Sequence, residues 1–107
     1  MTAHSLVMTT VDSADAADAL ARAVVEARAA ACAQVVGPIR STYRWAGAVT
    51  TDEEWQVLMK TTADAVDRLA EVITAHHGYD LPEIIAVPVT GGSPAYLRWV
   101  TDETRPD

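Results

Sequence analysis

Two adjacent histidines, His76 and His77, are the residues whose type best suits metal chemistry. Imidazole nitrogens are the commonest nitrogen ligands of copper and zinc in proteins. Side chains at neighbouring helical positions diverge by about 100°, so two of them rarely hold one ion unless the helix ends there. Gly78 follows directly, and we expect it to take the left-handed conformation that ends a helix. The alternative interpretation is that both histidines stabilise a helix carboxyl end through its dipole and last carbonyls.

Two further residues are candidates because each is the single example of its type. Cys32 is the only cysteine, so the chain has no internal disulfide and no Cys-x-x-Cys motif for zinc or redox chemistry. Because it stands among alanines and valines, we interpret it as a small buried apolar residue. Lys60 is the only lysine. We expect it to pair with Glu54 or with an acidic group across a subunit boundary, or to bind an anionic ligand.

Motifs of enzymes and nucleotide-binding proteins are not recognisable in the sequence. Gly91-Gly92-Ser93 precedes a predicted helix, but it matches neither a P-loop nor a dinucleotide-binding fingerprint. Serine, histidine and aspartate all occur, yet no nucleophile-elbow pattern singles out a catalytic triad. The sequence therefore predicts a protein that is not an enzyme and has no obligatory cofactor.

The composition excludes other classes of protein. The chain has 107 residues, of which 50% are hydrophobic and 21% charged, which predicts one compact domain over residues 1–107. Eight basic residues stand against fifteen acidic ones, for a formal net charge of −7. Such a surface repels phosphate backbones, so we expect no nucleic-acid partner. No apolar run approaches the roughly 18 residues of a membrane span, and no secretory leader is recognisable. We expect a cytoplasmic protein without membrane contact.

Hydrophobic periodicity predicts the order β-α-β-β-α-β followed by a short helix. We expect strands at 5–10, at 32–45 with an interruption at Gly37-Pro38, at 53–61 and at 83–89, and helices at 15–31, at 63–77 and after Ser93. Pro88 lacks an amide hydrogen, which indicates an edge, a bulge or the end of its strand. This order is the split β-α-β arrangement of a ferredoxin-like α+β sandwich with an antiparallel sheet.

One sheet with both helices on one face leaves its other face bare. The chain also carries an unusual number of large aromatic side chains for its length, among them Tyr43, Trp45, Trp55 and Trp99. A bare sheet face, exposed strand edges and spare aromatic residues together predict burial against other copies of the chain.

The chain contains, in this order, RAAACAQVV at 28–36, STYRWAG at 41–47, EE at 53–54, VLMKT at 57–61, HHGYDLPE at 76–83, PV at 88–89 and YLRW at 96–99. With this order and spacing the chain resembles, along nearly its whole length, the CutA divalent-cation-tolerance family. The resemblance implies a ferredoxin-like subunit in a tight homotrimer, related in architecture to the PII signal-transduction trimers. It also implies a cytoplasmic role in the response to metal ions, especially copper or another divalent cation.

The resemblance further implies a set of metal ligands, namely a cysteine on the first strand and a histidine pair. The pair is present as His76 and His77, whereas the cysteine position falls on Thr9, whose hydroxyl is a poor copper ligand. A metal-binding protein would need an acid such as Asp80 or Glu83 to converge with the histidines. A PII-like sensor would instead bind a small ligand in a cleft between subunits, near Tyr43, Trp45, Glu54, Lys60 and Tyr79. A structural trimer that serves as an interaction hub would need neither.

Overall fold

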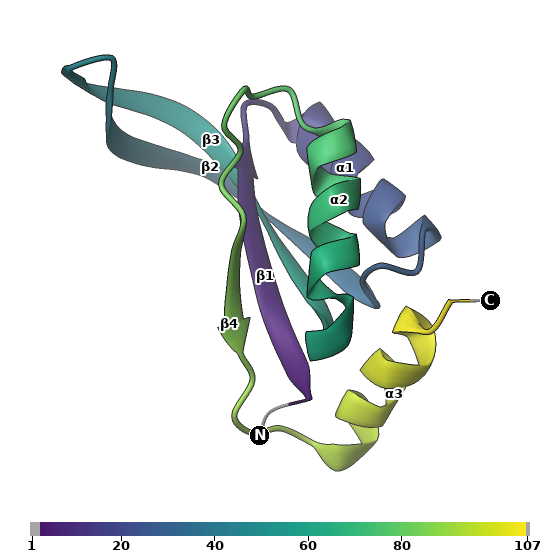
Figure 1. Ribbon diagram of the computed structural model, residues 1–107. Helices are drawn as coiled ribbons and strands as arrows, with labels where there is room; N and C mark the ends of the chain where they lie inside the picture. The colour runs from purple at the N-terminus through teal and green to yellow at the C-terminus, as the bar shows by residue number, and fades with distance from the viewer. Residues whose placement is uncertain (1–2, 107) are drawn as a thin grey trace.

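Four strands form one antiparallel sheet in the order β2-β3-β1-β4, as a computed structural model describing residues 3–106 shows (Figure 1). Helices α1 and α2 pack on one face of this sheet, and α3 lies at the end opposite the hairpin turn. The elements are β1 (His4–Val11), α1 (Ala14–Glu26), β2 (Cys32–Trp45), β3 (Ala48–Thr62), the short 3-10 turn η1 (Ala63–Ala65), α2 (Val66–His76), β4 (Ile85–Pro88) and α3 (Pro94–Thr104). The predicted ferredoxin-like order with a carboxyl-terminal helix is confirmed. Residues 1–2 and 107 of the domain predicted over 1–107 lie outside the described residues.

The core lies between the two central strands and the helices α1 and α2. Alternate residues of β1 and β3 face the helices and are fully buried, because successive side chains of a strand point to opposite faces. The apolar stripes predicted for both helices meet them there. The fully buried residues of this layer include Val7, Val57, Met59, Val24, Leu69 and Ile73.

Helix α1 ends at Glu26, five residues before the end that the sequence predicted. Arg28 takes a left-handed conformation with φ of 55°, and the amides of Ala29 and Ala30 both donate to the carbonyl of Val24. The alanines that follow are buried in this turn. Alanine suits a helix and a tightly packed turn equally well, so its periodicity continued past the true end.

Three other expected boundaries are also corrected. β3 begins at Ala48 instead of 53, because its pairing with β2 continues to a two-residue turn at Ala46 and Gly47 with φ of 51° and 82°. α2 ends at His76, and His77 is extended. Gly78 therefore does not take the expected left-handed conformation. β4 is only four residues long. Pro88 ends it, and β4 is an edge strand, so two of the three positions that its missing amide indicated are found and the bulge is not.

The hairpin of β2 and β3 projects beyond β1 and β4 and gives the molecule a long axis of 44 Å (Figure 1). Its register shifts between Val36 and Ile39, around the cis peptide bond of Gly37-Pro38. Gly37 lies so close to the indole ring of Trp55 that a Cβ atom at this position would overlap the ring. The interruption predicted at Gly37-Pro38 is thus a register shift within a continuous strand, at the point where the hairpin leaves the main sheet. Cys32, expected to be buried, is only half-buried where β2 begins.

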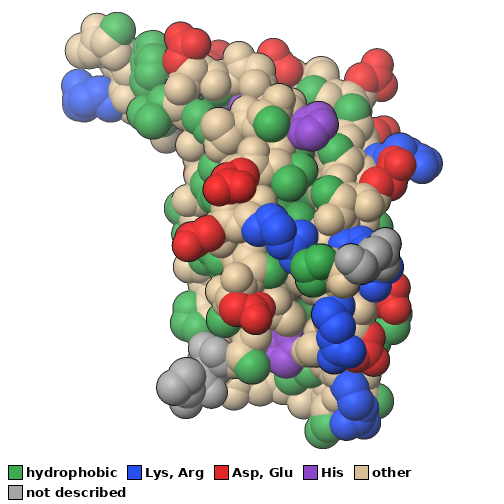
Figure 2. All heavy atoms as spheres, turned by 45° about the vertical axis from the view of Figure 1, so that its right-hand side comes forward, with side chains coloured by type: hydrophobic (Ala, Val, Ile, Leu, Met, Phe, Trp, Pro, Cys, Tyr) green, Lys and Arg blue, Asp and Glu red, His purple; other side chains and the backbone are tan. Residues whose placement is uncertain are grey.

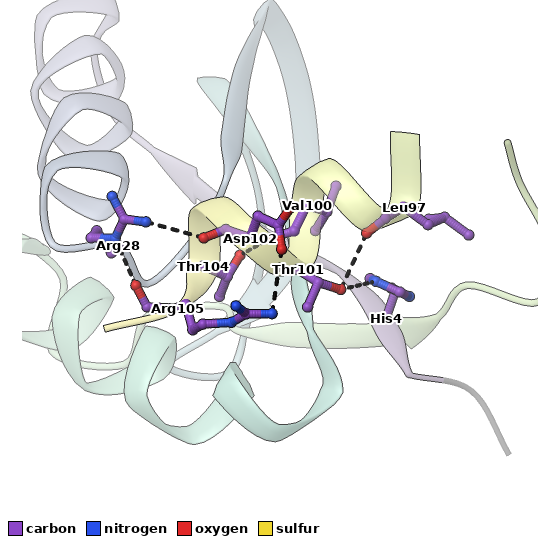
Figure 3. A network of polar contacts seen from close by, with 8 residues as sticks. All are labelled: His4, Arg28, Leu97, Val100, Thr101, Asp102, Thr104 and Arg105. Carbon is purple, nitrogen blue, oxygen red and sulfur yellow. Dashed lines mark hydrogen bonds and ion pairs between the residues drawn. The ribbon is translucent and has the colours of Figure 1, made fainter. Parts of the chain in front are cut away.

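Helix α3 is held to the body by Arg28 and Arg68, which donate to carbonyls at its carboxyl end, and Figure 3 shows the contacts of Arg28. Arg28 donates to the carbonyls of Asp102 at 3.1 Å and Arg105 at 2.6 Å. Arg68 donates to the carbonyl of Thr104 at 3.0 Å. These carbonyls have no partner within a helix, so guanidinium groups satisfy them. No helix within residues 3–106 is both long and apolar enough to cross a bilayer.

Two fully buried threonines on the core face of the sheet differ in their hydrogen bonding. Thr61 Oγ1 donates to the carbonyl of Ala29 at 2.8 Å, whereas Thr9 Oγ1 has no partner among the described residues. A buried hydroxyl without a partner costs free energy that a methyl group of the same shape does not. We expect Thr9→Val to raise the free energy of unfolding by about 1 kcal/mol, measured by urea denaturation at one protein concentration.

The matched variant Thr61→Val should lower the free energy of unfolding by about 1 kcal/mol, because it leaves a buried carbonyl without its donor. Both changes keep the β-branched shape, so strand propensity does not distinguish them. Equal destabilisation in the two variants would show that Thr9 has a hydrogen-bond partner after all.

Candidate functional site

A cavity of about 720 Å³ opens where the central sheet gives way to the projecting hairpin. β1 ends at Val11, which pairs with Trp55, while the next residue of β3, Glu54, pairs with β2. The hairpin residues beyond this point form one wall. Residues 78–83, which connect α2 to β4, form the other wall, and we call them the connecting segment.

Glu54 and Tyr79 join the two walls of the cavity. Glu54 is only 7% exposed, and its Oε2 accepts a hydrogen bond of 2.8 Å from the Tyr79 hydroxyl. Burial raises the pKa of Tyr79 well above its usual value, and the hydrogen bond to the Glu54 carboxylate raises it further. The phenol therefore stays protonated at neutral pH and remains the donor of this bond.

The outer rim of the cavity consists of aromatic residues on the hairpin. The Tyr43 hydroxyl donates to the carboxylate of Asp52, and this bond is the main cause of a raised Tyr43 pKa. Trp45 is 54% exposed beside it. Four of the five residues that the sequence suggested for a small ligand thus line one cavity: Tyr43, Trp45, Glu54 and Tyr79.

Lys60, the fifth suggested residue, does not line this cavity. It is six residues from Glu54 along the same strand, which corresponds to about 20 Å at ~3.3 Å per residue. Its Nζ donates to Gln34 Oε1 at 2.8 Å and lies 5.8 Å from the centre of the Tyr96 ring. The interpretation that Lys60 pairs with Glu54 is therefore wrong within one chain.

His77 uses both of its ring nitrogens to fasten the connecting segment to the sheet. Nε2 lies 2.8 Å from the carbonyl of Thr10, which can only accept, so this nitrogen carries the hydrogen. Nδ1 then accepts from the backbone amide of Tyr79 at 3.1 Å. The His77 and Tyr79 rings also pack together, with their centres 4.8 Å apart. This arrangement fits a neutral imidazole without a free lone pair.

His76 has a different environment, although it is the next residue. Its Nδ1 lies 2.9 Å from the carbonyl of Val72, one turn earlier in α2, so Nδ1 donates and Nε2 carries the lone pair. This contact with a helix carbonyl agrees with the alternative interpretation for His76, whereas His77 contacts a carbonyl of β1 and not of the helix. The side chain of His76 is exposed.

The residues implied as metal ligands do not form a ready-made copper site. Thr9 is fully buried in the core, and the nitrogens of His77 are occupied by backbone groups. Over residues 3–106, no three side chains of histidine, cysteine, aspartate or glutamate lie where they could hold one ion. Of the two histidines, His76 is therefore the one that can bind a metal, through the lone pair of its Nε2.

Sequence reasoning missed the role of the Thr10 carbonyl, which anchors His77. The residue types do not predict a contact with a backbone carbonyl. The one available signal was the predicted end of the first strand, where carbonyls lose their strand partners. Glu54 entered the sequence analysis as a possible partner of Lys60, and Tyr79 entered it through the family resemblance alone. Neither spacing nor periodicity predicts a contact between two residues that lie on different elements.

Comparison with known proteins gives a consistent result. Residues 5–103 match the family model described as "CutA1 divalent ion tolerance protein". The chain is 42% identical over 101 residues to the divalent-cation tolerance protein CutA of Thermus thermophilus, covering 94% of this chain and 98% of that protein. It is 41% identical over 100 residues to the chloroplastic protein CutA of Arabidopsis thaliana, covering 94% of this chain and 55% of that protein. The chain therefore spans about half the length of the plant relative.

Solved structures agree over nearly the whole chain. The crystal structure of CutA from Xylella fastidiosa superposes with a TM-score of 0.94 at 38% identity, covering 97% of this chain and 100% of that one. The divalent cation tolerance protein from Thermus thermophilus superposes with a TM-score of 0.92 at 41% identity, covering 95% of this chain and 99% of that one.

The raised pKa of Tyr79 predicts how stability responds to alkaline pH. The unfolded chain loses this phenolic proton near the ordinary value of 10.0, while the folded chain keeps it to higher pH. The free energy of unfolding should therefore be unaffected by this group below about pH 10 and should fall above it. In Tyr79→Phe the fall should be shallower, as measured by denaturation at several pH values.

At neutral pH, Tyr79→Phe should also lower the free energy of unfolding by about 1–3 kcal/mol, because the buried Glu54 carboxylate loses its donor. Tyr96→Phe removes a phenol outside the cavity and serves as the control. The same change of alkaline slope in both variants would contradict the role of the Tyr79–Glu54 contact.

Proposed function

The chain belongs to the CutA1 divalent ion tolerance protein family, and from this membership we propose that it acts in metal-ion tolerance as a cytoplasmic homotrimer. The match to the family over residues 5–103 is the observation that carries the proposal. The family is named for ion tolerance and not for a reaction, so the proposal includes no catalytic step. The cytoplasmic location rests on the cysteine content, since a lone cysteine needs no oxidising compartment.

Exposed apolar residues support the homotrimer. On the projecting hairpin Val49 is 65% exposed and Trp45 is 54% exposed, and Leu81 on the connecting segment is 72% exposed. Hydrophobic side chains gather on this arm in Figure 2. A two-stranded arm of this kind is marginally stable by itself and gains stability when a second copy covers it. If the arm of each copy contacts the next copy head to tail, three copies can close into a ring in which no contact surface remains unpaired.

Light scattering in the presence of a chelator should give three times the 11.4 kDa mass of one chain, because apolar burial and not an ion holds the assembly. Trp45→Ala should shift the equilibrium toward the monomer by several kcal/mol, as for a central interface residue. Val25→Ala removes an exposed apolar group from α1 and should leave the mass unchanged. A monomeric wild-type chain in chelator would refute the proposal.

Direct copper binding is the second part of the proposed function, and the geometry supports it at one histidine. The exposed Nε2 of His76 carries a lone pair. His77 could bind an ion only by giving up its bond to Thr10 or to the amide of Tyr79. A single imidazole with solvent ligands predicts weak to moderate copper affinity. This affinity should decrease as the pH is lowered, because protons compete with copper for the same lone pair.

Calorimetric titration with copper(II) at physiological salt tests this assignment, since salt screens the acidic surface. His76→Ala should remove most of the specific heat of binding. His77→Ala should lower the melting temperature, because the connecting segment loses two hydrogen bonds, while copper binding remains. His4→Ala is the control for histidine content. Copper binding that survives His76→Ala and disappears in His77→Ala would reverse the assignment.

A further inference from the structure

The Glu54 carboxylate is buried without a positive partner. It is 7% exposed, and the Tyr79 hydroxyl is the donor that it meets at 2.8 Å. Within residues 3–106 this carboxylate takes part in no ion pair. Removing a carboxylate from water is costly unless a cation or several donors compensate it. One hydrogen bond from a neutral phenol does not supply that compensation, so the site favours a positive group in the cavity.

The remaining charged groups around Glu54 make the cavity more negative. Asp80 and Glu83 also line it, and the residues that line it within the described chain include no lysine, arginine or histidine. Tyr79 keeps its proton because burial and the nearby carboxylate raise its pKa. Burial is the main cause of this raised pKa, and the negative charges of Glu54 and Asp12 add to it. An anionic ligand would therefore be repelled, and a cation would be attracted.

The shape and walls of the cavity favour an organic cation over a metal ion. A volume of about 720 Å³ is far larger than one ion needs and lies in the range of small-molecule sites. The carboxylates are not placed as a group that could hold one metal. The aromatic ring of Tyr43 on the hairpin wall offers the surface that ammonium groups and apolar carbon chains prefer.

We propose that this cavity binds a small organic amine in its protonated form, with the ammonium group on Glu54 and the carbon skeleton against Tyr43. The site is distinct from the exposed nitrogen of His76. It gives the hypothesis of a small-ligand sensor a definite chemical class. In this arrangement the ligand supplies the positive charge that the Glu54 carboxylate lacks as a partner, and the hydroxyl of Tyr79 holds the carboxylate in position.

Benzylamine tests the proposal, with benzyl alcohol as an uncharged analogue of nearly the same shape and magnesium chloride as an inorganic cation. Calorimetric titration of the assembled protein at physiological salt and neutral pH should show benzylamine binding at least about tenfold more tightly than benzyl alcohol, a difference of ~1.4 kcal/mol. Magnesium at millimolar concentration should not displace benzylamine. Glu54→Gln keeps an acceptor for Tyr79 but removes the charge, so it should abolish the preference for the amine.

Two control variants make the outcome decisive. Glu71→Gln removes an exposed carboxylate from α2 and should leave the preference unchanged, which separates the site from the general acidity of the surface. Equal affinities for the amine and the alcohol, or displacement by magnesium, would overturn the proposal. Lys60→Gln tests whether a lysine of a second copy already occupies the site. Benzylamine binding that occurs in this variant alone would assign the missing charge to that lysine and not to a ligand. None of these results depends on copper binding at His76.

Discussion

The antiparallel register of β1 and β3 is the constraint on which the rest of the molecule depends. Val7 lies opposite Met59, and Thr9 opposite Val57, so one face of both strands meets the helices. A shift by one residue would turn these side chains to the bare face of the sheet and leave the helices without a core. The same register fixes where β1 stops beside β3 and therefore where Glu54 leaves the central sheet. The core and the cavity are consequences of one pairing.

The end of β1 also explains why two adjacent histidines have different roles. An unpaired carbonyl at Thr10 accepts the Nε2 hydrogen of His77, and the same ring accepts the amide of Tyr79. The connecting segment is thereby held against the sheet, and the phenol of Tyr79 reaches Glu54 on the opposite wall. His76 is still on the helix and faces solvent. The position of the helix end, between two neighbouring residues, separates a structural group from one that can meet a metal.

The sequence predicts the order of elements well because strand and helix periods are local properties. It fails where a residue type suits two conformations, as in the alanines after Glu26, which continue the helical pattern into a turn. It also fails at Gly78, because the extended His77 had already ended the helix. For the site, residue types alone could not separate Lys60 from Glu54 or bring Tyr79 to it. Those facts depend on distances along β3 and on contacts between elements that no local pattern records.

The close approach of Gly37 to Trp55 has a consequence for how such a chain can change over time. The indole occupies the space that any side chain at position 37 would need. A larger residue there becomes acceptable only after the ring is replaced by something smaller, and restoring the ring would then require glycine again. The two positions, far apart in the sequence but in contact at the base of the arm, should therefore change together among related chains. Covariation at this pair would mark lineages in which the arm leaves the sheet at a different angle.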